Sequence, residues 1–341
     1  MSTKTTGLML FLVLALGLLG AGPAAAGRLD GIRARGVLTC GILPAVGGFA
    51  ADDGKGGFQG LDVDTCRAVA AAIFGSPDKI KFVIAQNVQQ LKDADAIDIV
   101  ARRITWSLTR ATTNGLMFGP ITFYDGQGFM VPKKSGIRGA KQLNGKAVCV
   151  QAVEAHATSV AEYFKASGLS LTALPVPDNA QAERALKSGA CAAYSADVSW
   201  LGAARAAMAG GSEAYDILPE LISKEPLAPL VRQGDDQFFE IVRWSIFAMI
   251  AAEERGITSQ NIDGAGTAHR DVETKQFMGE VAGNGAALGL AENWAYNIIK
   301  TVGNYGEVFD RNVGRGSPIK LERGLNRLWT EGGLMYAPRL R

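Results

Sequence analysis

Histidine is nearly missing from this chain: His156 and His269 are the two that occur among 341 residues. Closely spaced cysteines are missing too. The chain has four cysteines, Cys40, Cys66, Cys149 and Cys191. Because zinc sites are built from closely spaced cysteine and histidine ligands, the sequence argues against a zinc centre.

A strong charge of one sign is also missing. Lysine and arginine number 35 and aspartate and glutamate 33, which gives a formal net charge of +2. This balance argues against nucleic acid as a partner. The pattern supports no Ser-His-Asp order, phosphate-binding loop or metal-ligand spacing. We therefore expect a protein that is not an enzyme and that uses no cofactor.

Long hydrophobic runs are limited to residues 8–19, which follow Lys4 and precede the small-residue sequence AGPAAA. A positive start, an apolar centre and an A-x-A ending are typical of a secretory signal peptide. A membrane anchor is the alternative, but the run is short for a bilayer. We predict that residues 1–26 are a signal peptide and that the mature protein, starting near Gly27, is periplasmic.

Apolar residues are plentiful, since 48% of the chain is hydrophobic and 20% charged. Residues 27–341 exceed what one compact core usually holds, so we expect two lobes. Strand patterns at residues 37–42, 79–84 and 97–101 alternate with helix patterns at 62–74 and 88–92. This order predicts an α/β fold with a parallel sheet.

The same alternation returns later in the chain. We predict strands at residues 147–151, 171–176, 190–194 and 215–219, and helices at 140–143, 157–166, 179–188, 198–209 and 237–255. Residues 116–131 and 222–232 have the pattern of two crossings between lobes. We therefore predict a bilobal α/β fold with a two-crossing hinge, an extended C-terminal tail and a ligand between the lobes. Lobe one is assigned residues 27–130 and 232–341, and lobe two residues 131–231.

The four cysteines of an exported chain suggest two disulfides. Three pairings are possible. Cys40 ends a predicted strand and Cys66 lies in the first turn of the next helix, so these two can be adjacent. Cys149 and Cys191 both lie in strand-like runs of the later half. We favour Cys40–Cys66 and Cys149–Cys191, one bridge in each lobe; four buried free thiols are the alternative.

Residues 98–110, DIVARRITWSLTR, are the centre of the functional interpretation. They begin as an apolar strand and continue as a polar, basic segment. The carboxyl ends of strands are where open α/β sheets bind ligands, and a guanidinium offers a planar fork of donors to a carboxylate. The alternative is a surface loop with solvated arginines.

Several longer stretches resemble one protein family. They are GLDVDTCRAVAAAIFG (60–75), TWSLTR (105–110), YDGQGFMV (124–131), LNGKAVCVQ (143–151), PELISKEP (219–226), VRQGDDQFFEIVRW (231–244) and residues 294–338. The chain resembles the periplasmic solute-binding proteins of polar amino acid ABC transporters, most closely the general L-amino acid-binding branch. The resemblance implies a monomer that captures an amino acid or related zwitterion and delivers it to an inner-membrane permease.

The resemblance also implies roles for individual residues. Arg110 matches the arginine that binds the ligand carboxylate, with the hydroxyl of Thr105 beside it. Arg103 falls where the family directs a backbone carbonyl toward the α-ammonium, and Asp197 matches the acid that accepts this ammonium. The alternatives are that Asp197 caps the following helix and that Thr105 caps its own backbone.

Two loops depart from the family pattern. Where the family reads close to Q-T-G-T-T, this chain has Gln151, Ala152, Val153, Glu154, Ala155 and His156, and Leu43 replaces a usually polar residue in the first lobe. We hypothesise that Glu154 and His156 shift specificity toward neutral or cationic ligands, because an added carboxylate repels acidic ones. Arg102 and Arg103 act against this, and Arg103 pairing with Glu154 across the cleft would remove the preference.

Two other functions remain open at this stage. A diverged sensor would bind a receptor ectodomain in place of a permease. A dehydratase-like enzyme on the same fold would turn its ligand over, with Glu154 and His156 as the nearest acid/base pair; this idea rests on fold analogy alone.

Overall fold

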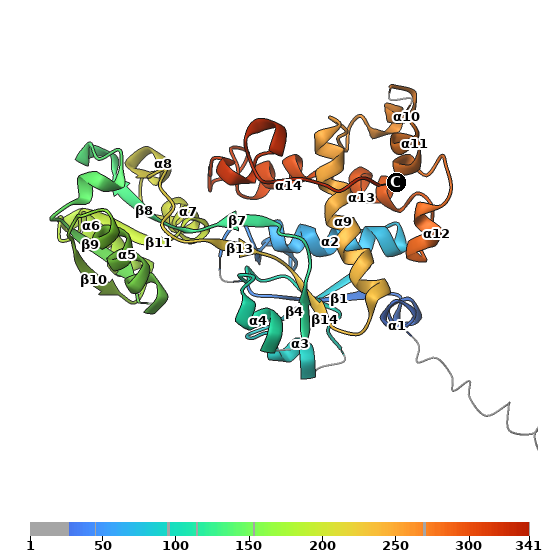
Figure 1. The fold of residues 1–341 in the computed structure, drawn as a ribbon, viewed down its shortest axis with the longest axis horizontal. Helices are drawn as coiled ribbons and strands as arrows, with labels where there is room; N and C mark the ends of the chain where they lie inside the picture. Colours follow the sequence, from blue (N-terminus) through green and yellow to red (C-terminus); the bar gives the residue numbers. More distant parts are fainter. Residues whose placement is uncertain are drawn as a thin grey trace, which may run out of the picture.

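The structure is a computed structural model that describes residues 27–44, 46–93, 96–113, 115–152, 154–268 and 271–340. The predicted signal peptide, residues 1–26, lies outside the described residues. Within these ranges no helix has the length and apolar character needed to cross a membrane. The chain forms two α/β lobes joined by a narrow connection (Figure 1), so the predicted bilobal fold is confirmed.

Lobe one is built on a five-stranded sheet of order β4-β1-β5-β14-β6. Its strands are β1 (Leu38–Ile42), β4 (Ile80–Ile84), β5 (Ile99–Val100), β6 (Leu116–Phe118) and β14 (Leu230–Arg232). The strands β1, β4 and β5 are parallel, as predicted, and all five residues of β1 are buried, which is typical of a central parallel strand. A small antiparallel hairpin of β2 (Ala51–Asp52) and β3 (Phe58–Gln59) lies between β1 and α2 in the sequence.

Helices from distant parts of the sequence form the core of lobe one. The helices α2 (Leu61–Phe74), α9 (Asp236–Glu254) and α13 (Trp294–Thr301) pack against one another. Shorter helices complete the lobe: α1 (Arg28–Arg35), α3 (Gln89–Asp93), α4 (Leu108–Thr113), α10 (Ala265–Ala268), α11 (Val272–Met278), α12 (Asn284–Leu288) and α14 (Tyr305–Asn312). Except for α1, α3 and α4, these helices follow α9, so the C-terminal part of the chain belongs largely to lobe one.

Lobe two is built on a second five-stranded sheet of order β10-β9-β11-β8-β12. Its strands are β8 (Gln127–Pro132), β9 (Ala147–Gln151), β10 (Thr172–Val176), β11 (Ala193–Asp197) and β12 (Tyr215–Ile217). Its helices are α5 (Glu154–Ala166), α6 (Asn179–Ser188), α7 (Val198–Ala207) and α8 (Gly211–Ala214), with 3-10 turns at Lys133–Ser135 and Ala140–Leu143. The strand β11 lies three residues later than predicted, because the chain turns at Gly189 and Cys191 still bonds back to Ala185.

A two-stranded ribbon joins the lobes: β7 (Phe123–Asp125) pairs antiparallel with β13 (Glu225–Leu227). The predicted boundaries at 130/131 and 231/232 therefore fall inside β8 and β14, which belong to different sheets. The apolar run of β8 is buried throughout, so its sequence gives no sign of the sheet it joins. We propose that the lobe boundaries lie in the β7–β13 ribbon.

Both disulfides form as predicted. Cys40 of β1 is bonded to Cys66 of α2, and Cys149 of β9 is bonded to Cys191, which precedes β11. Each bridge therefore lies within one lobe and ties a strand to a segment that covers or adjoins its sheet.

A tail segment, residues 313–326, follows α14 and reaches lobe two. Arg205 of α7, which is 7% exposed, donates hydrogen bonds to the carbonyls of Ile319 at 2.7 Å and Lys320 at 2.9 Å. On the lobe-one side, Arg323 binds Glu253, and Asn326 exchanges two hydrogen bonds with the backbone of Tyr124 in the ribbon. The tail segment thus links lobe one, the ribbon and lobe two.

Candidate functional site

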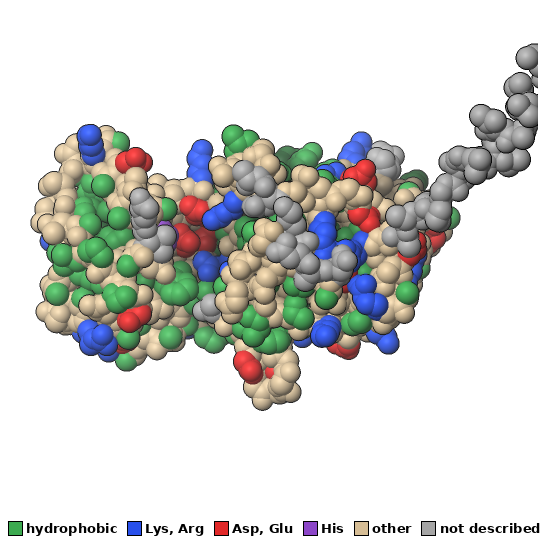
Figure 2. Space-filling view, turned by 90° about the horizontal axis from the view of Figure 1, so that it is seen from below, with side chains coloured by type: hydrophobic (Ala, Val, Ile, Leu, Met, Phe, Trp, Pro, Cys, Tyr) green, Lys and Arg blue, Asp and Glu red, His purple; other side chains and the backbone are tan. Residues whose placement is uncertain are grey.

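Asp197 lies where both lobes meet. It is the last residue of β11 and precedes α7, so it stands at the carboxyl end of a lobe-two strand. Its Oδ1 atom lies 3.0 Å from Nε2 of His156, and its Oδ2 atom lies 3.7 Å from Nη2 of Arg103 in lobe one. Both carboxylate oxygens therefore face nitrogen atoms of the protein. Figure 2 shows acidic and basic side chains side by side at the junction of the lobes, with a histidine next to them.

Arg103 crosses from lobe one to lobe two. Its Nε donates a hydrogen bond to the hydroxyl of Ser199 at 3.1 Å, and its guanidinium lies 5.4 Å from the ring centre of Phe49. The backbone of Arg103 is left-handed, with a positive φ of 56°. Among the described non-glycine residues, Lys320 is the only other one with a positive φ. This conformation is uncommon outside glycine, asparagine and aspartate and often marks a functional position.

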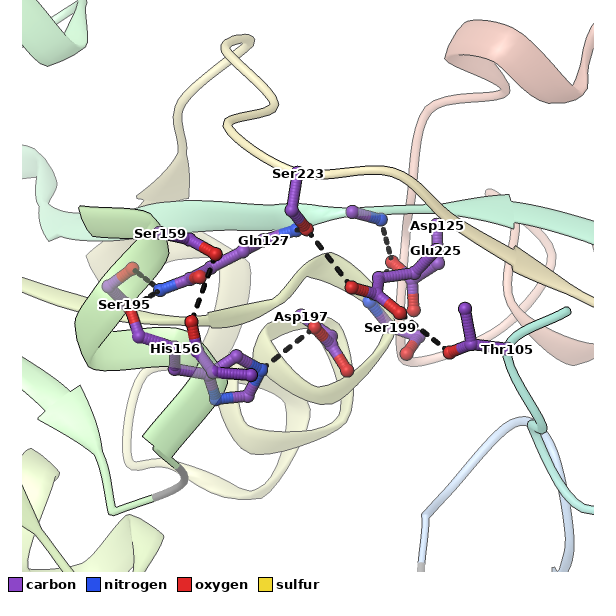
Figure 3. A network of polar contacts seen from close by, with 12 residues as sticks. Thr105, Asp125, Gln127, His156, Ser159, Ser195, Asp197, Ser199, Ser223 and Glu225 are labelled. Atoms are coloured by element: carbon purple, nitrogen blue, oxygen red, sulfur yellow. Dashed lines mark hydrogen bonds and ion pairs between the residues drawn. The ribbon is translucent and has the colours of Figure 1, made fainter. Parts of the chain in front are cut away.

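His156 is positioned from the first turn of α5. Its backbone carbonyl accepts a hydrogen bond from Nε2 of Gln127, which also donates to the hydroxyl of Ser195 (Figure 3). With Nε2 donating to Asp197, the Nδ1 atom is buried and has no hydrogen-bond partner in the described part of the chain. His156 is therefore held by lobe two and directed at Asp197.

Asp125 of the ribbon is a site residue that the sequence interpretation missed. It is 3% exposed, and its Oδ1 accepts hydrogen bonds from the backbone of Gly126 at 2.9 Å and of Ser199 at 3.1 Å. Burial, followed by the charge of the nearby Asp197, raises the pKa of Asp125 to about 6, although Arg103 acts in the opposite direction. The bond to Ser199 caps α7. Asp197 occupies the N-cap position but makes no such side-chain bond, so its proposed capping role is wrong.

Thr105 is tied to the ribbon. Its hydroxyl donates to Oε2 of Glu225 at 2.6 Å, and the hydroxyl of Ser223 donates to Oε1 of the same carboxylate at 3.3 Å. The backbone of Thr105 also forms an isolated bridge with Leu227. The hydroxyl of Thr105 therefore connects the ligand-site loop to the hinge and does not cap its own backbone.

Arg110 lies in α4 with an exposed guanidinium. Its Nη1 donates to the backbone carbonyl of Thr105 at 3.0 Å, so the two residues are neighbours as the sequence suggests. Beneath this loop, Asp62 is 5% exposed, and burial raises its pKa to about 7 against the opposing charges of Arg103 and Arg102. Burial also lowers the pKa of Arg102.

The remaining predicted residues are less involved in the network. Leu43 follows β1 and is partly buried, and Gln151 ends β9. Ala155 is exposed, and its carbonyl accepts a bond from Ser159 one turn later. The side chain of Glu154 lies outside the described residues, so its hypothetical pairing with Arg103 remains a prediction.

The site has donors and acceptors suited to binding a small polar molecule. Groups of three or more histidine, cysteine, aspartate or glutamate residues that could hold a metal ion do not occur in the described ranges. Of the acids and hydroxyls that sequence reasoning missed, Asp125, Ser223 and Glu225 lie within the predicted crossings, and Asp62 and Ser199 lie in the first turns of predicted helices. Polar residues in otherwise apolar crossing segments, as in YDGQGF and SKEP, are the signal that could have identified several of them.

Comparisons with known proteins all find similarity to bacterial solute-binding proteins. The family described as bacterial extracellular solute-binding proteins, family 3, matches residues 38–260. The general L-amino acid-binding periplasmic protein of Rhizobium johnstonii is 43% identical over 326 residues, which cover 94% of this chain and 95% of that protein. The glutamate/glutamine/aspartate/asparagine-binding protein of Rhodobacter capsulatus is 42% identical over 329 residues, which cover 96% and 97%.

A solved structure is similar over nearly the whole chain. It is an ABC transporter periplasmic binding protein from Brucella ovis with glutathione bound, which has a TM-score of 0.81 and 42% identity. The match covers 93% of this chain and 100% of that chain. The ligand named there is a small molecule that carries carboxylates and an amine.

Proposed function

The chain belongs to family 3 of the bacterial extracellular solute-binding proteins, and from this membership we propose that it is the periplasmic ligand-binding subunit of an ABC importer. It captures an amino acid or a related small carboxylate between its lobes and delivers it to an inner-membrane permease. The relatives are named as binding proteins, and we propose that this chain is likewise not an enzyme.

One observation supports the proposal most directly. Arg103 of lobe one and Asp197 with His156 of lobe two meet beside the β7–β13 ribbon. Residues from two lobes that converge at strand ends form the kind of site that hinge closure completes. A ligand bound there contacts both lobes and so favours the closed arrangement over the open one.

We propose that Arg110 binds a ligand carboxylate, with Thr105 holding the loop in place. The guanidinium of Arg110 is exposed, and one of its donors is used by the carbonyl of Thr105. Its remaining donors can form the two parallel bonds that a carboxylate accepts. In this arrangement Thr105 acts through its bond to Glu225, which fixes the loop to the hinge.

The test is a thermal-shift screen of residues 27–341 with amino acids, opines, polyamines, small organic acids and glutathione, followed by calorimetry. A ligand present at about one hundred times its dissociation constant adds about 2.7 kcal/mol to the free energy of unfolding. We expect at least one carboxylate to bind with about micromolar affinity, which corresponds to about 8 kcal/mol. Failure of every compound to shift the unfolding temperature contradicts the proposal.

Two further measurements check the rest of the assignment. Mass spectrometry of the bound compound after long incubation should find it unchanged, whereas a product identifies an enzyme. Intact-mass analysis of protein purified from the periplasm should give a chain that starts near Gly27. A chain that retains residues 1–26 contradicts the proposed signal peptide.

A further inference from the structure

Protein groups face both oxygens of the Asp197 carboxylate. Its Oδ1 faces His156 and its Oδ2 faces the permanently charged guanidinium of Arg103. The side chains of Arg103 and Asp197 are 16% and 24% exposed, so water screens their attraction incompletely. A ligand ammonium that approached this carboxylate would meet the like charge of Arg103 and would have to displace it.

Arg103 is also held in place by two other interactions and by its backbone conformation. Its Nε is bonded to the hydroxyl of Ser199, which is fully buried, and its guanidinium lies over the ring of Phe49. Its left-handed backbone places the side chain there at a conformational cost. A side chain held from several directions in this way gives way less readily to a ligand cation than a solvated side chain does.

The other acids near the loop are buried or already bonded to protein donors. Asp62 and Asp125 are buried, and burial raises their pKa values to about 7 and about 6. Both carboxylate oxygens of Glu225 accept bonds from hydroxyl groups. Donors, in contrast, are in surplus: Nε of Arg102 is buried without a hydrogen-bond partner among the described residues, and the guanidinium of Arg110 is exposed.

We propose that Arg103 takes the place of a ligand ammonium at Asp197, so that the protein prefers acids whose α-amine is absent or acylated over the corresponding free amino acids. This inference rests on the proposed binding function and names its ligand class. Such a ligand places a carboxylate near Arg110 and a hydroxyl, carbonyl or second carboxylate against Arg103 and His156. The hypothesis that Glu154 favours cationic ligands is thereby opposed by the described charges.

The experiment compares matched pairs that differ at the α-amine alone or nearly so. The pairs are L-glutamate with L-2-hydroxyglutarate, L-aspartate with L-malate, L-leucine with L-2-hydroxyisocaproate, L-arginine with its 2-hydroxy analogue, and glutathione with its N-acetyl derivative. Calorimetry on residues 27–341 should show at least tenfold tighter binding of the amine-free or acylated member in every pair that binds.

The variant Arg103→Asn removes the built-in cation and leaves a residue that adopts the left-handed backbone more readily. It should reverse the preference, with the free amino acid now at least tenfold tighter than its partner, because Asp197 becomes available. Arg138→Asn is the matched control, because the side chain of Arg138 is 65% exposed in lobe two and pairs with Asp216 away from this site. This variant should prefer the same member of each ligand pair as the wild type does.

The outcomes separate the two proposals. The role of Arg103 is overturned if the wild type binds the free amino acids more tightly than their amine-free or acylated analogues. It is also overturned if Arg103→Asn ranks the ligands as the wild type does. In both cases the binding function stands. Absence of binding by both proteins to every probe contradicts the binding function itself, and the inference with it. Circular dichroism and the unfolding temperature of Arg103→Asn show whether the variant is folded; Arg103→Gly provides a second variant that also accepts the left-handed backbone.

Discussion

Replacing the buried acid beneath the ligand-site loop should stabilise the protein at neutral pH. Asp62 is 5% exposed in the first turn of α2, and burial raises its pKa from 3.8 to about 7. The folded state therefore keeps this proton up to about pH 7, whereas the unfolded state releases it near pH 4. Between these values the unfolded state binds fewer protons, so the free energy of unfolding falls as pH rises, and above pH 7 the loss is complete.

The size of the expected stabilisation follows from how far the pKa of Asp62 is raised. A pKa change from 3.8 to about 7 corresponds to roughly 4 kcal/mol as an upper limit, at about 1.4 kcal/mol for each pH unit. Asparagine has the shape of the protonated acid and never ionises. We therefore expect Asp62→Asn to match the wild type near pH 4 and to exceed its free energy of unfolding by about 1–3 kcal/mol at pH 8, because relaxation of the site reduces the limit.

Urea unfolding of residues 27–341 at pH 4, 5, 6, 7 and 8 measures this difference. The control is Asp30→Asn, at an exposed position of α1. Its free energy of unfolding should follow that of the wild type across the whole pH range. Asp125 titrates with a raised pKa of about 6 in both proteins and therefore cancels from their comparison. Parallel curves for Asp62→Asn and the wild type, or a less stable variant at pH 8, refute the reasoning.

Three other outcomes are expected. Arg110→Ala should weaken binding of the carboxylate ligand at least a hundredfold in calorimetry while changing the free energy of unfolding by less than about 0.5 kcal/mol, since its guanidinium is exposed; Arg110→Lys should also bind weakly, and wild-type affinity in either variant contradicts the clamp. Replacing Cys149 and Cys191 together by serine opens a loop with a sequence separation of 42 and should cost about 4 kcal/mol in chemical unfolding, with an unchanged midpoint as the contrary result. Arg205→Ala removes two bonds from a buried guanidinium to the tail segment and should lower the free energy of unfolding by about 2–4 kcal/mol; a loss of less than about 1 kcal/mol contradicts its structural role.

Local patterns were sufficient to predict the elements of both lobes. The strands β9 and β1 and the helices α6 and α9 lie within one residue of their predicted bounds, because alternating or continuous apolar runs and capping residues are local signals. The disulfide pairing also followed from local reasoning, since each bridge lies within one lobe. The predicted lobe boundaries differ by several residues from those that we propose in the β7–β13 ribbon, because a buried strand has the same pattern in either sheet.

The site was harder to predict because its contacts join residues that are distant in the sequence. Arg103 and Ser199 are separated by 96 positions, and Thr105 and Glu225 by 120. The resemblance assigned Arg103 a backbone role, whereas its side chain reaches the other lobe, and this direction depends on a left-handed backbone that arginine rarely adopts. Asp125 was missed because its burial arises from packing between the ribbon and α7.

The tail segment has a mechanical consequence. The two-stranded β7–β13 ribbon is a narrow joint between the lobes. The tail adds a third link beside it, anchored to lobe two through Arg205 and to the ribbon through Asn326, and residues of the ribbon, the tail and lobe two line a hollow of about 310 Å³. We expect this third link to resist twisting of the lobes more than bending toward the tail, because twisting would pull on its bonds to both lobes. We therefore expect one direction of closure to be favoured, so that each closure brings the same two surfaces together.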